Sequence, residues 1–267
     1  MRSIVFAAAL LAQLLASPAA QALEPYKVYD RFSDKPLDPT RWPDSEKIRE
    51  IKGGALHLMQ RTWSDGFGDF GLLPVNWSNN FMNPASITQM RARVNVHALE
   101  TNACLSNPSI ADARARIIGG FFNVGVPTAG SQVGDMLAQI RFIRASNSPD
   151  PKDVLHIEGI VSVCSNADCS FAATQGNIVN LGTVTLGTAA TVEMKWDKGG
   201  KTFYFSRDSG AYSGTVGYWQ DDTNLPGTLF RQLSTRVNVP HCQSAPRVPA
   251  VVDVRFDNVF VNQSALP

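Results

Sequence analysis

Apolar and polar residues alternate with a period of two along most of this chain, the pattern of strands that bury one face. Clusters of Gly, Pro, Asn and Asp separate the alternating segments, and no helical stripe is sustained beyond a short turn expected near residues 108–115. The pattern predicts strands at residues 55–61, 87–97, 114–123, 137–144, 154–164, 170–174, 177–186, 191–196, 201–207 and 251–261.

The segment VEMKWDKGGKTFYFSRD, residues 192–208, has the pattern of a hairpin. Asp197 to Gly200 provide the turn, and Phe203 and Phe205 fall on one face of the returning strand. Many strands at roughly ten-residue spacing predict an all-β fold, a two-sheet antiparallel β-sandwich or jelly roll.

Composition agrees with a single globular domain. The 267 residues are 44% hydrophobic and 18% charged, and sandwiches of about 200 to 250 residues commonly form one domain. The formal net charge of +1 gives no extended basic field, so nucleic acid is not an expected partner.

The first 22 residues have the features of a secretory signal peptide: Arg2, an apolar run over residues 4–15, Pro18, and small residues at Ala20 and Ala22. The run is too short for a membrane anchor. We therefore expect a cut after Ala22, a sandwich domain over 23–267 without a transmembrane segment, and a secreted or periplasmic location.

Four cysteines suit an oxidising compartment. Cys164 and Cys169 flank a turn in VCSNADCS, so a disulfide closing that hairpin is the simplest pairing, and Cys104 with Cys242 follows by elimination. A metal site is the alternative, but the four histidines are scattered and none stands at ligand spacing to the cysteines.

Three polar and aromatic segments have the chemistry of a sugar site: RTWSDGFGDFG at 61–71, NWSNNF at 76–81 and GYWQDD at 217–222. Trp and Tyr rings stack on sugar rings while Asp and Asn bind hydroxyls. The candidate ligand-binding residues are Trp63, Asp65, Asp69, Trp77, Asn79, Asn80, Tyr218 and Trp219. In the alternative interpretation, the tryptophans plug the edge of the sandwich and the glycines only supply turn geometry.

Both ends of the chain resemble secreted concanavalin A-like (LamG-like) sandwiches. The similar segments are DRFSDKPLDPTRW at 30–42 with REIKGGALHLMQR after it, the inner strand ITQMRARVNV at 87–96, and the closing strand VDVRFDNVFV at 252–261. The resemblance implies the fold of lectins, glucanases and polysaccharide lyases, and by itself no activity. It also implies a structural Ca²⁺ held by Asp30, Gly54 and Asp257, with surface or turn-capping roles for these residues as the alternative.

The motifs of the catalytic members are not matched. No strand carries the E-x-D-x-x-E acids of the glucanases, and Arg141 stands where the lyase histidine would be expected after Gln139. If adjacent strands pair, however, alternation gathers a basic face from Arg91, Arg93, His97, Arg114, Arg116, Gln139, Arg141, His156 and Glu158. This face either is a concave sheet that holds acidic sugars or sulfate through arginine, or is the solvated outside of the sandwich.

The sequence thus predicts a carbohydrate-binding, lectin-like sandwich whose partner is a glycan, such as a polysaccharide. One alternative is an enzyme that degrades an acidic glycan with Arg93, Arg141, His156 and Glu158. The other is a structural or adhesion domain of the cell envelope.

Overall fold

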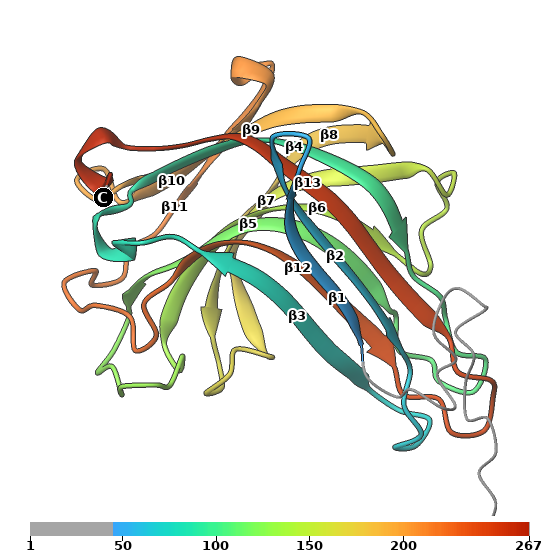
Figure 1. Cartoon of the computed structure of the whole chain (residues 1–267). Coiled ribbons are helices and arrows are strands. Elements are labelled where there is room, and N and C mark those ends of the chain that lie inside the picture. Colours follow the sequence, from blue (N-terminus) through green and yellow to red (C-terminus); the bar gives the residue numbers. More distant parts are fainter. Residues whose placement is uncertain (1–44, 267) are drawn as a thin grey trace, which may run out of the picture. The chain divides into compact units, whose positions relative to one another are not determined.

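The computed structural model describes residues 45–266, which form two antiparallel sheets packed on one another (Figure 1). The signal peptide predicted at 1–22 lies outside these residues. The seven-stranded sheet contains, in spatial order, β1 (Glu46–Lys52), β2 (Ala55–Trp63), β13 (Pro249–Val261), β4 (Gln89–Glu100), β9 (Ala189–Asp197), β10 (Thr202–Arg207) and β11 (Tyr212–Gly217). The six-stranded sheet contains β3 (Leu72–Asn80), β12 (Arg231–Pro240), β5 (Asp112–Asn123), β6 (Asp135–Ala145), β7 (Val154–Cys164) and β8 (Ala172–Thr185).

This architecture confirms the predicted all-β, two-sheet antiparallel sandwich. Three short 3-10 turns complete the described part of the chain: η1 (Pro84–Ser86), η2 (Asp208–Gly210) and η3 (Gln263–Ala265). The closing strand β13 inserts between β2 and β4, while β12 inserts between β3 and β5. Each sheet therefore has an interior position that is filled by a strand from the end of the chain.

The core lies between the sheets and follows the predicted alternation. On β4 every second side chain is buried, and the two phenylalanines of β10 share the inner face. In the facing sheet, Gly159 of β7 leaves room for Phe205, because a Cβ on this glycine would lie 2.4 Å from Cγ of the ring. The two sheets can therefore approach closely at this point.

Several local predictions are wrong. The NWSNNF segment was not among the predicted strands, but residues 76–80 are the second half of β3. The two strands predicted at 170–174 and 177–186 are one strand, β8, and residues 112–113, expected within the short turn near 108–115, already belong to β5. Strands β1, β3, β11 and β12 were not predicted as strands from the alternation.

The predicted basic face is divided between the two sheets. Strand β4, which carries Arg91, Arg93 and His97, belongs to the seven-stranded sheet, whereas β5, β6 and β7 are neighbours in the other. Adjacent strands in sequence do not all pair here, because the connection from β4 to β5 crosses from one sheet to the other. Only the predicted residues of β5, β6 and β7 remain in one sheet, where Arg141 of β6 contacts Glu158 of β7.

Both expected disulfides are present, Cys104–Cys242 and Cys164–Cys169. The first joins residues 138 positions apart and would contribute about 5 kcal/mol in the chain-entropy model, while the second closes a five-residue step after β7. Over residues 45–266 the fold contains no helix long and apolar enough to cross a membrane.

Candidate functional site

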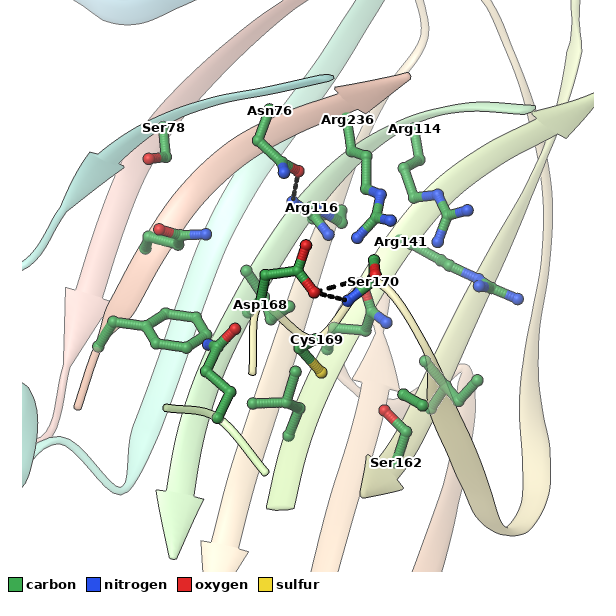
Figure 2. Close-up of a pocket in the computed structure, with 18 of the residues that line it drawn as sticks. Asn76, Ser78, Arg114, Arg116, Arg141, Ser162, Asp168, Cys169, Ser170 and Arg236 are labelled. Atoms are coloured by element: carbon green, nitrogen blue, oxygen red, sulfur yellow. Dashed lines mark hydrogen bonds between the residues drawn. The ribbon is translucent and has the colours of Figure 1, made fainter. Parts of the chain in front are cut away.

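A polar hollow of about 380 Å³ lies on the face of the six-stranded sheet that points away from the core (Figure 2). Alternation on β5 explains its position: Ala113 and Ala115 are buried between the sheets, so Arg114 and Arg116 point to the opposite face. We call it the arginine hollow. Its charged lining residues are Arg114, Arg116, Arg141, Arg236 and Asp168, and its neutral polar ones include Asn76, Ser78, Gln132, Gln139, Ser162, Ser170, Thr174, Gln232 and Asn238.

Two of the four arginines have carboxylate partners. Nε of Arg114 donates to Oδ1 of Asp112 at 2.7 Å. Both Nε and Nη2 of Arg141 lie 2.7 Å from Oε2 of Glu158 on the neighbouring strand. These charge-assisted contacts orient both guanidinium groups along the floor of the hollow.

The other two arginines have only neutral partners in the part of the chain described. Arg116, which is 4% exposed, donates to Oγ of Ser234 at 3.2 Å and to Oδ1 of Asn76 at 2.9 Å. Arg236 donates to Oδ1 of Asn238 at 3.0 Å. No carboxylate of residues 45–266 lies within 4.0 Å of either guanidinium, so direct contact with these residues does not neutralise their charges.

Burial and the positive charges of neighbouring arginines lower the pKa of Arg116 and of Arg236. Burial, and next the positive charge of Arg236, lower the pKa of Arg116 well below its ordinary value. Burial, and next the charge of Arg114, lower the pKa of Arg236. Desolvation and mutual repulsion both disfavour the charged forms, and a bound anion would relieve both.

One side-chain oxygen in the lining of the hollow lacks a hydrogen-bond partner among the described residues. Gln139 on β6 is 8% exposed, and its Oε1 has no hydrogen-bond partner among the described residues. A buried amide oxygen without a donor costs about 1 to 3 kcal/mol. This oxygen is itself inaccessible, so a ligand hydroxyl in the hollow reaches it only if the amide group turns outward.

The disulfide Cys164–Cys169 closes a loop at one edge of the hollow. This loop carries Asp168 and Ser170, which Figure 2 shows beside the arginine side chains. Hydrogen bonds from the backbone and the hydroxyl of Ser170 lower the pKa of Asp168, so this carboxyl is ionised at neutral pH.

The predicted sugar-binding segment at 61–71 lies elsewhere, in the connection from β2 to β3. Trp63 is 8% exposed, so little of its ring is accessible. Asp65 contacts Nδ1 of His241, and Asp69 accepts hydrogen bonds from residues of two other loops. The side chains that this loop exposes are Phe67 and Phe70.

Trp77 in the second predicted segment packs against the core at the edge of the sandwich. Its Nε1 donates to the carbonyl of Ile48 on β1 at 2.8 Å, which links the edges of the two sheets, and Lys47 and Arg49 lie over its ring. Asn79 and Asn80 end β3 and pair with residues of β12. The surroundings of Trp77 match the edge-plug interpretation.

In the third segment the two aromatic residues differ. Tyr218 is buried in a cluster of aromatic rings; its hydroxyl donates to Asp222 at 2.6 Å and accepts from Nε1 of Trp196 at 2.9 Å. Burial, and next the bond to Asp222, raise its pKa. Trp219 is 83% exposed, so its ring remains available for stacking.

The residues considered for catalysis are dispersed. Arg93 lies on β4 in the other sheet, and Arg141 and Glu158 form the ion pair described above. His156 is on β7 with Nε2 2.8 Å from Oδ2 of Asp150, and it does not line the hollow. The structure therefore brings together only two of the four.

Of the three predicted calcium ligands, Asp30 lies outside the described residues. Gly54 has a positive φ of 80° in the turn between β1 and β2. Asp257 follows Phe256, which pairs with Leu56, so Asp257 and Gly54 lie at the same end of β2 and β13. Among residues 45–266 no group of three or more His, Cys, Asp or Glu side chains gathers at metal-binding distance. Calcium stays a prediction.

Sequence reasoning missed Arg236, Asn238 and Asn76, because β12 and β3 were not recognised. The signal was present in STRVNV at 234–239, where Val237 and Val239 alternate with polar residues. Only the pairing of β12 with β5 brings Arg236 beside Arg114 and Arg116.

The sequence matches no protein-family model and no curated protein at a significant level. Among solved structures, one similar protein is a glycoside hydrolase family protein from Mycobacterium thermorestibile, with 15% identity over 77% of this chain and 79% of that one and a TM-score of 0.37. A family 7 alginate lyase is 9% identical over 80% and 85%, with a TM-score of 0.38, and a legume lectin-like domain from Entamoeba histolytica is 8% identical over 83% and 93%, with a TM-score of 0.31. These distant likenesses include both lectins and carbohydrate-active enzymes.

Proposed function

We propose that this protein binds an anionic carbohydrate in the arginine hollow. The observation that carries the proposal is Arg116, a guanidinium that is 4% exposed, has only neutral partners within residues 45–266, and lies beside Arg236. Guanidinium groups bind carboxylate and sulfate groups through paired hydrogen bonds. An anionic group of a sugar would therefore be held where the protein has left positive charge uncompensated.

Neutral side chains in the hollow favour a carbohydrate over a simple anion. Asn, Gln, Ser and Thr side chains, Gln139 among them, surround the arginines. Such groups exchange hydrogen bonds with sugar hydroxyls and fix the orientation of the ring. The hollow offers little apolar surface, so hydrogen bonds and charge would dominate binding.

Binding is better supported than cleavage. Among the described lining residues Asp168 is the single carboxylate, and neither His nor Tyr lines the hollow. Glycoside hydrolysis by the common mechanisms uses two carboxyl groups about 5 to 10 Å apart on either side of the sugar bond. Glu158 accepts a hydrogen bond from Arg141, and this contact holds the arginine in position.

We place this binding outside the cytoplasm. Two disulfides among the described residues are stable in the oxidising conditions of the periplasm or the cell exterior. The polysaccharides of those spaces often carry carboxylate or sulfate groups.

The test is calorimetric titration of the disulfide-bonded protein with neutral, carboxylated and sulfated oligosaccharides of equal length. We expect the anionic ligands to bind and the neutral ones not to bind. Arg236→Gln, which removes one charge at a partly exposed position, should weaken binding at least tenfold.

The matched control is Arg91→Gln, which removes the same charge from the outer face of the other sheet, where Arg91 stacks on Phe260. It should bind as the unmodified protein does. Equal binding of neutral and anionic sugars, or equal losses in the two variants, would contradict the proposal.

A further inference from the structure

The charges in and around the arginine hollow leave a small excess of positive charge. Asp112 and Glu158 neutralise Arg114 and Arg141 by direct contact. Arg116 and Arg236 remain, and Asp168 is the single further carboxylate among the described lining residues. Four arginines therefore face three carboxylates, and one negative charge on a ligand would balance the set.

Asp168 is held in place by its own loop. Its Oδ1 accepts from Nδ2 of Asn166 at 2.8 Å, from the backbone of Ser170 at 3.1 Å and from the hydroxyl of Ser170 at 2.9 Å. Its Oδ2 accepts no hydrogen bond from any described residue. One carboxylate oxygen therefore fixes the side chain, and the other is free to contact a ligand.

The loop that carries Asp168 is itself anchored on both sides. The disulfide Cys164–Cys169 closes it, and the backbone of Gln132 donates to the carbonyl of Ala167 at 2.8 Å. Figure 2 shows the Asp168 side chain extending from this loop toward the hollow, near the guanidinium groups of Arg116 and Arg236. No arginine nitrogen of the described part of the chain lies within 4.0 Å of its carboxylate, so Asp168 leaves space between itself and the arginines of the hollow.

The position of Asp168 beside Arg116 and Arg236 limits how many anionic groups a ligand can bring into the hollow. An anionic group can approach Arg116 and Arg236 while a neighbouring hydroxyl donates to Oδ2 of Asp168. If that neighbour were a second anionic group, it would face Asp168 without a proton to share. Like charges in a partly desolvated site repel strongly, so the second group would be rejected.

We propose that Asp168 is a specificity-determining residue that restricts the hollow to glycans with about one anionic group per bound sugar and a free hydroxyl beside it. This inference rests on the proposed function, because it assumes that the hollow binds an anionic carbohydrate. It assigns selection against densely charged glycans to one carboxylate on a disulfide-closed loop.

The experiment compares two probes of equal length in calorimetric titration at constant ionic strength. One is a uronic-acid hexasaccharide with one carboxylate per sugar, and the other is a heparin hexasaccharide with several sulfate groups per disaccharide. The unmodified protein should prefer the uronic-acid probe. Asp168→Asn keeps the size of the side chain and an acceptor for Ser170, and it should raise affinity for heparin at least tenfold relative to the uronic-acid probe.

Asp221→Asn is the matched control. Asp221 is an exposed loop carboxylate that also accepts from the backbone and the hydroxyl of a residue two positions ahead, Thr223, and it does not line the hollow. It should leave the preference unchanged. An unchanged preference in Asp168→Asn, or the same change in both variants, would overturn the inference while leaving the proposed function in place. If the unmodified protein binds neither probe nor any other anionic glycan, the proposed function fails and the inference fails with it.

Discussion

Arg231 is a buried cation whose partners are uncharged. It is 1% exposed, its guanidinium lies 3.7 Å from the centre of the Phe121 ring, and it donates to the carbonyls of Ile87, Gly120 and Phe230. Burial lowers its pKa to about 9, so it is still charged at neutral pH. These contacts fix the side chain across β5, where Gly119 leaves the space that it fills.

We therefore expect Gly119→Ala to destabilise the fold. A Cβ at this position would lie 2.3 Å from Cδ of Arg231, and the carbonyl contacts prevent the arginine from moving aside. The expected cost is about 1 to 3 kcal/mol in the free energy of unfolding, measured by urea denaturation. Gly217→Ala is the control, since no heavy atom lies within 4 Å of its Cβ, and similar losses in the two variants would contradict the explanation.

Single residues also show what the sequence could predict about the site. The aromatic and acidic residues of the 61–71 segment were recognisable, but their partners His241 and Ser244 are more than 170 positions away. The local sequence does not show that the carboxylate of Asp69 accepts hydrogen bonds from two other loops. For Arg114 and Arg116, in contrast, the alternation with alanine was sufficient to place them away from the core.

At the scale of elements, Asp69 holds three connecting loops together. It accepts hydrogen bonds from Ser106 in the β4–β5 loop and from Gln243 and Ser244 in the β12–β13 loop, and the disulfide Cys104–Cys242 joins the same two loops. The hydroxyls of Ser106 and Ser244, followed by backbone N–H groups, hold the pKa of Asp69 well below its ordinary value of 3.8.

This depressed pKa predicts a particular pH dependence. A carboxyl whose pKa is lower in the folded state stabilises the fold above the pKa of the unfolded chain, and the effect is lost as pH falls toward the folded value. Asp69→Asn should therefore be less stable than the unmodified protein between pH 5 and 7, by a margin that shrinks below about pH 4. Denaturant midpoints at each pH measure this margin. Asp153→Asn, whose carboxylate accepts no hydrogen bond from the described residues, should show no such margin, and a margin for Asp69→Asn that is constant with pH would refute the role of its charge.

The elements themselves were predicted where alternation was strong. Strand β7 was predicted with its observed bounds and the β9–β10 hairpin with its turn, because neighbouring β-branched and aromatic residues define them locally. Strand β3, in contrast, contains a proline and is rich in asparagine, so its sequence has the character of a turn. It becomes a strand because it pairs with β12 and packs Val75 and Trp77 against the core.

At the scale of the whole molecule, sheet order decides where charges gather. The alternation and spacing of strands predicted the sandwich, and the turn between Cys164 and Cys169 predicted the pairing of its cysteines, but the arginine hollow exists because β12 lies between β3 and β5. That order brings Arg236, more than 110 positions distant in sequence, beside Arg114 and Arg116. The pairing of remote strands is not encoded in any local pattern, so the basic face was predicted with β4, which lies in the other sheet, and without β12.

The charge collected in this way predicts how ligand binding responds to salt. A ligand that binds only the folded protein stabilises it by about 2.7 kcal/mol at a hundredfold excess over Kd, so an anionic oligosaccharide should raise the thermal midpoint. Screening reduces this effect, because the Debye length falls from about 8 Å at 0.15 M to about 3 Å at 1 M salt. We expect the increase in midpoint to shrink steadily over that range, and to shrink less in Arg236→Gln, where less charge contributes to binding. Parallel scans without ligand correct for salt effects on the protein itself. An increase that did not change with salt would mean that uncharged contacts dominate, and the hollow would then have to recognise sugar hydroxyls rather than the anionic group.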